Sequence, residues 1–73
     1  MVNDPNQLHL KLESLRKEFQ ELRREIAYTY IEIQKAQDKG EDTSIYLCLQ
    51  IDNLQRAQGI LNEYCYLIKE ISN

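Results

Sequence analysis

A chain of 73 residues can form one small domain, which we place over residues 1–73, and the apolar core of such a domain usually supplies only about 3 to 5 kcal/mol. Two cysteines and one histidine are too few for a structural zinc site, so a protein partner or a second copy is the expected source of extra stability. The net charge of −3 is mild and both signs are interleaved, which argues against a ligand recognised by charge alone.

The sequence carries no pattern of a membrane or export segment. Its apolar stretches fall far short of the roughly 20 residues that a membrane helix needs, and its first seven residues hold neither a basic region nor an apolar run. The cysteine usage suits a reducing compartment. We therefore expect a cytoplasmic protein without membrane insertion.

A first helix is predicted at about residues 5–39. Asp4 can cap it, Pro5 suits its first position, and Gly40 is a stop signal. One row of its residues alternates spacings of four and three, the heptad pattern of a coiled coil, with Thr29 as the only polar member. The row is Leu8, Leu12, Leu15, Phe19, Leu22, Ile26, Thr29, Ile33 and Ala36.

A second helix is predicted at about residues 43–71, capped by Asp42 or Ser44. The connection between the helices is so short that they must run antiparallel. The predicted fold class is therefore all-α, an antiparallel two-helix hairpin of coiled-coil-like character.

The second helix has two apolar rows, more than one neighbouring helix can cover. We call one the Leu47 row: Leu47, Ile51, Leu54, Gln58, Leu61, Cys65 and Ile68. The other is the Ala57 row: Ala57, Ile60, Tyr64, Leu67 and Ile71. Gly59 is expected on the outer face, where neither packing nor any other feature explains it.

The Leu47 row is predicted to pack on the first helix. In an antiparallel hairpin the residue numbers of two facing positions add up to a constant, and for this row the sum varies by only one unit. The predicted layers are Ala36 with Leu47, Ile33 with Ile51, Thr29 with Leu54, Ile26 with Gln58, Leu22 with Leu61, Phe19 with Cys65, and Leu15 with Ile68. Thr29 and Gln58 would share a hydrogen bond. The Ala57 row then remains for a partner, and the predicted partner-binding residues are Ala57, Ile60, Tyr64, Leu67 and Ile71, with Tyr28 and Ile31 as weaker candidates.

No catalytic, cofactor or metal constellation emerges, and we expect the protein not to be an enzyme. Cys48 and Cys65 would lie about 26 Å apart on one helix, beyond disulfide reach. Nucleic-acid binding is disfavoured because the basic residues are interspersed with carboxylates that cancel their field. These basic residues are Lys11, Arg16, Lys17, Arg23 and Arg24.

From Leu8 to Ile68 the chain resembles the YscE-like family, the small helical-hairpin co-chaperones of type III secretion needle subunits. The likeness lies in a long polar-flanked first helix, the turn Lys39-Gly40-Glu41-Asp42, Tyr46 early in the second helix, and the run Leu54-Gln55-Arg56-Ala57-Gln58-Gly59-Ile60-Leu61-Asn62-Glu63-Tyr64-Cys65-Tyr66. It is a pattern of residue types spread along the hairpin.

The resemblance implies a cytosolic protein that binds a larger helical-repeat chaperone and helps to keep the needle subunit monomeric before export. A homodimer when free is compatible with the same residues. The alternative is a homodimeric four-helix-bundle regulator, either RNA-binding like the plasmid regulator Rop or a small protein inhibitor or adaptor.

Overall fold

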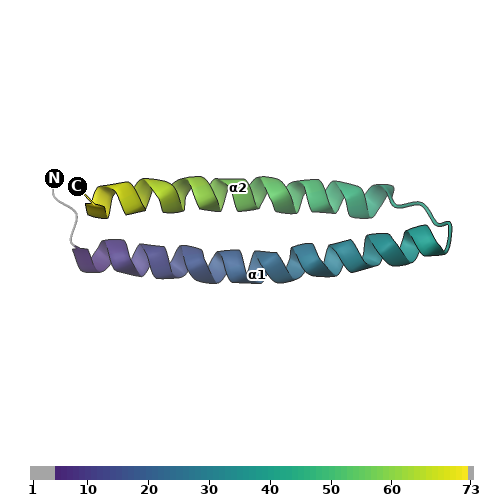
Figure 1. Ribbon diagram of the computed structural model, residues 1–73, viewed down its shortest axis with the longest axis horizontal. Coiled ribbons are helices and arrows are strands. Elements are labelled where there is room, and N and C mark those ends of the chain that lie inside the picture. Colours follow the sequence, from purple (N-terminus) through teal and green to yellow (C-terminus); the bar gives the residue numbers. More distant parts are fainter. Residues whose placement is uncertain (1–4, 73) are drawn as a thin grey trace.

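The computed structural model describes residues 5–72 and contains two helices, α1 (Pro5–Asp38) and α2 (Ser44–Ser72). They lie side by side and antiparallel over a length of 56 Å, with Pro5 and Ser72 at one end and the turn at the other (Figure 1). The predicted helical hairpin is confirmed, and its helix limits differ from the expected ones by at most one residue. The capping role predicted for Asp4 lies outside the described residues.

Gly40 ends α1 as the sequence indicates. Its φ of 71° is in the left-handed region that glycine adopts without strain. Its N–H donates to the carbonyl oxygen of Gln37 at 3.1 Å, and the N–H of Glu41 donates to that of Ala36 at 2.8 Å. This pair of bonds is a Schellman motif, which satisfies carbonyl groups that the helix end would leave free.

Asp42 holds the start of α2. Its Oδ1 accepts hydrogen bonds from the Ser44 hydroxyl at 2.6 Å and the Ser44 N–H at 2.9 Å. These bonds lower the pKa of Asp42 below its ordinary value, and the bond from the hydroxyl has the larger effect. The carboxylate is therefore ionised at neutral pH, as the positive end of a helix dipole favours. Of the two predicted caps, Asp42 is the acceptor.

The row predicted for α1 does face α2. Six of its members are buried: Leu8, Leu15, Leu22, Thr29, Ile33 and Ala36. At the end away from the turn, Leu8 and Leu15 form an apolar cluster with Leu67, against which Leu12 and Ile60 pack. The α1 half of the interface thus follows the heptad pattern.

The face of α2 that packs on α1 is not the predicted one. The Leu47 row is largely exposed, whereas the Ala57 row faces α1, continued toward the turn by Asn53, Gln50 and Tyr46. The predicted layers are therefore wrong by one residue of α2, which corresponds to a rotation of about 100° around the helix axis. The antiparallel register is otherwise kept.

A polar group in the middle of the hairpin accounts for this choice. The buried Asn53 donates through Nδ2 to the Thr29 hydroxyl at 3.5 Å and to Gln50 Oε1 at 3.2 Å, and Gln50 Nε2 donates to the Ile26 carbonyl at 3.0 Å. A buried hydroxyl needs such a partner. The predicted bond between Thr29 and Gln58 is absent from the hydrogen bonds recorded for residues 5–72, and the exposed Gln58 donates to Asn62 instead.

The two glycines should respond oppositely to alanine. A Cβ at Gly59 would meet no atom within 4 Å, so Gly59→Ala should stabilise α2 by about 1 kcal/mol and raise Tm by about 4–8 °C. Gly40→Ala should cost about 1–2 kcal/mol, because alanine is strained at the left-handed φ. Thermal unfolding followed by circular dichroism checks both. A lower Tm for Gly59→Ala would contradict the open surroundings of that residue.

Candidate protein-binding surface

Five of the seven predicted partner-binding residues lie in the interface between the helices. Ala57 and Leu67 are buried and Ile60 is half-buried, while Tyr64 and Ile71 at the edge keep 37% of their surface exposed. The prediction that this row is spare is wrong, because the polar match of Asn53 to Thr29 turns it inward. Tyr28 and Ile31 are exposed and free for a partner.

The Leu47 row is the surface that the hairpin leaves uncovered. It runs along α2 over three heptads, about 32 Å, with Gln58 as its only polar member. Its exposed large side chains are Leu47, Ile51, Leu54, Leu61 and Ile68. A contiguous apolar stripe of this length is typical of a protein interface. The row that is richer in large aliphatic residues is thus the outer one.

A shallow hollow lies beside the Leu47 row, at the edge where α1 meets α2. Phe19, Leu61 and Tyr64 line it together with Arg16, and its volume is about 200 Å³. An aliphatic or aromatic side chain of a partner could fill such a hollow. Arg16 gives this edge of the apolar surface a positive rim.

A second apolar area, the turn-end patch, consists of Tyr28, Ile31, Ile45, Cys48 and Leu49. All five are exposed. Leu49 joins its parts, because it lines one hollow with Ile45 and Cys48 and another with Tyr28. Ile31 follows Tyr28 by three residues and so lies beside it on α1.

The first two turns of α2 therefore present apolar side chains in every direction. Six of the seven residues from 45 to 51 are apolar, with Gln50 as the exception. Tyr46 is half-buried toward α1, the Leu47 row occupies one flank, and the turn-end patch occupies the other. A helix that is apolar all round is usually enclosed by protein.

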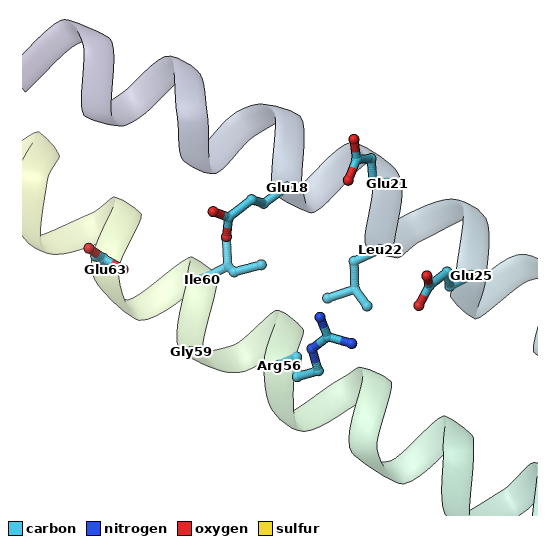
Figure 2. Close-up of a pocket in the computed structure, with 8 residues that line it drawn as sticks. All are labelled: Glu18, Glu21, Leu22, Glu25, Arg56, Gly59, Ile60 and Glu63. Atoms are coloured by element: carbon cyan, nitrogen blue, oxygen red, sulfur yellow. The ribbon is translucent and has the colours of Figure 1, made fainter.

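The edge of the hairpin that carries Gly59 has a different character. Glu18, Glu21 and Glu25 of α1 and Glu63 of α2 surround a hollow of about 410 Å³, whose floor includes Leu22, Ile60 and Gly59. In Figure 2, Arg56 extends from α2 toward Leu22, between the two helices. The charges on α1 are thus partly sorted, with carboxylates at this edge and Arg16 at the other. The helical spacing of the sequence agrees, because it puts Glu18 and Glu25 on one flank of the first helix and Arg16 on the other.

The described part of the chain was searched for groups that could bind a metal ion or react. Among residues 5–72, no three His, Cys, Asp or Glu side chains are grouped closely enough to hold a metal ion. Cys48 and Cys65 are free thiols on the surface. Over the same residues, neither helix is long and apolar enough to cross a membrane.

No family model matches the chain, and neither a curated protein nor a solved structure is significantly similar to it.

Proposed function

We propose that the protein is a cytosolic co-chaperone of a type III secretion needle subunit. It binds a helical-repeat chaperone through the turn end of the hairpin, and together they keep the needle subunit monomeric before export. The protein acts by covering apolar surface and performs no chemistry. The observation that carries the proposal is the apolar surface that surrounds the first two turns of α2.

The distribution of that surface favours a concave partner. A flat partner can cover the Leu47 row or the turn-end patch but not both, since they lie on opposite flanks of α2. Stacked helical repeats form extended concave surfaces that can enclose a helix from several sides. The end that would enter is the turn end, which is free of chain termini over the described residues (Figure 1).

The residue pattern supports the same class of partner. The turn Lys39-Gly40-Glu41-Asp42 and the aromatic and aliphatic residues of α2 resemble those of YscE-like co-chaperones. Tyr46 stands in this part of α2, next to the Leu47 row. The turn-proximal third of the hairpin is therefore the part that would recognise the partner.

The direct test is to recover the protein from its native host with an affinity tag and to identify by mass spectrometry what accompanies it. The tag belongs at the N-terminus, because Pro5 lies at the end opposite the turn. We expect a helical-repeat protein and a short needle-like subunit, in a complex with one copy of each. Recovery of RNA or of a response regulator in their place would overturn the proposal and favour a regulatory hairpin.

A further inference from the structure

We infer that the free protein forms an antiparallel homodimer in which the Leu47 row of one copy packs on the Leu47 row of a second copy. The row is exposed along its whole length. This inference does not depend on the co-chaperone proposal, because it follows from the symmetry of the row itself.

The Leu47 row is nearly palindromic about Gln58. Counting outward from this residue, Leu54 and Leu61 stand four and three positions away, Ile51 and Cys65 seven positions each, and Leu47 and Ile68 eleven and ten. When a second α2 is laid antiparallel with Gln58 on Gln58, each apolar residue therefore meets an apolar residue of the other copy. A surface that complements itself in this way is what a two-fold symmetric dimer requires.

The single polar residue then lies on the two-fold axis. Gln58 already donates one hydrogen bond to Asn62 at 3.1 Å. Its amide oxygen can accept an N–H from Gln58 of the second copy, and the reciprocal bond forms by symmetry. One polar residue in an otherwise apolar seam fixes register and orientation. Any other register would set Gln58 against a leucine, an isoleucine or Cys65.

The available area suits a weak, reversible pair. The Leu47 row is about 32 Å long and one helix diameter wide, about 10 Å, so it covers about 320 Å² on each copy and about 640 Å² in total. That lies below the roughly 1,000 Å² of a stable interface and in the range of weak, transient contacts. The turn-end patch lies on the other flank of α2 and would stay outside this interface.

Disulfide cross-linking of single-cysteine variants tests both the dimer and its direction. In a Cys48→Ser, Cys65→Ser background, Gln58→Cys places a thiol on the two-fold axis, within the reach of about 7 Å between Cα atoms. Ile68→Cys is the matched control, because the two copies of residue 68 would lie about 30 Å apart. We expect oxidised glutathione to link Gln58→Cys into a covalent dimer and to leave Ile68→Cys unlinked.

Sedimentation equilibrium of the unmodified chain at 1–100 μM should give a mass that rises with concentration toward that of a dimer. Leu54→Asp with Leu61→Asp should give a helical monomer, with at least a 100-fold weaker association. A strictly monomeric unmodified chain would overturn the inference. Cross-linking of both cysteine variants to the same extent would also overturn it, since only a parallel pair brings residues 58 and 68 each onto their own symmetry mates.

Discussion

Leu67→Ala should leave the isolated hairpin largely unfolded. Leu67 is 6% exposed and belongs to the only apolar cluster of buried residues found over residues 5–72. Replacing a buried leucine by alanine costs about 2 to 5 kcal/mol, as much as the whole stability expected of a domain of this size. The measurement is urea-induced unfolding followed by circular dichroism at 222 nm.

Leu10→Ala is the matched control, because Leu10 lies near the same end of the hairpin and is 70% exposed. Its free energy of unfolding should stay within about 0.5 kcal/mol of the unmodified chain. Equal losses for the two variants would contradict the orientation of α2. The comparison thus decides directly whether the Ala57 row faces α1.

Ile45→Asp combined with Leu49→Asp should abolish binding to the proposed helical-repeat partner without unfolding the hairpin. Ile45 is 74% exposed, and Leu49 joins it to Tyr28 within the turn-end patch. Burying an aliphatic side chain of this size contributes about 1.5 to 3 kcal/mol, so the loss of two should weaken binding at least 100-fold. Isothermal titration with the purified partner measures the change in Kd.

The dimer should survive this double substitution, because neither residue belongs to the Leu47 row. Unchanged helicity and an unchanged dimer mass would show that the variant is folded. Leu10→Asp provides the control for adding a charge to exposed apolar surface away from the turn, and it should bind like the unmodified chain. Full affinity in the double variant would contradict insertion of the turn end.

The fold was predictable because its signals are local. Gly40 stops α1, Asp42 starts α2, and the short connection forces the helices to run antiparallel. The heptad row of α1 also identified its buried face, since α1 has only one such row. None of these inferences required knowledge of a contact between distant residues.

The orientation of α2 could not be read from apolar content. Both of its rows have helical spacing, and the Leu47 row has more large aliphatic side chains. The deciding contact is polar and links residues 24 positions apart, Asn53 and Thr29. The available signal was Thr29 itself: a buried hydroxyl needs a partner at its own level of the facing helix, and Asn53 is a polar residue there. The Ala57 row was expected to be exposed for the same reason.

The modest interior has a consequence for the heat capacity. The heat-capacity increase on unfolding scales with the apolar surface that becomes hydrated, about 12–15 cal/mol/K per residue for ordinary domains. In this hairpin the long Leu47 row and the turn-end patch are already hydrated in the single folded chain. Unfolding of the single chain should therefore give a smaller increase per residue, and association should carry a large negative heat-capacity change. Much of the apolar surface that other domains bury on folding would thus be buried in this protein only on association.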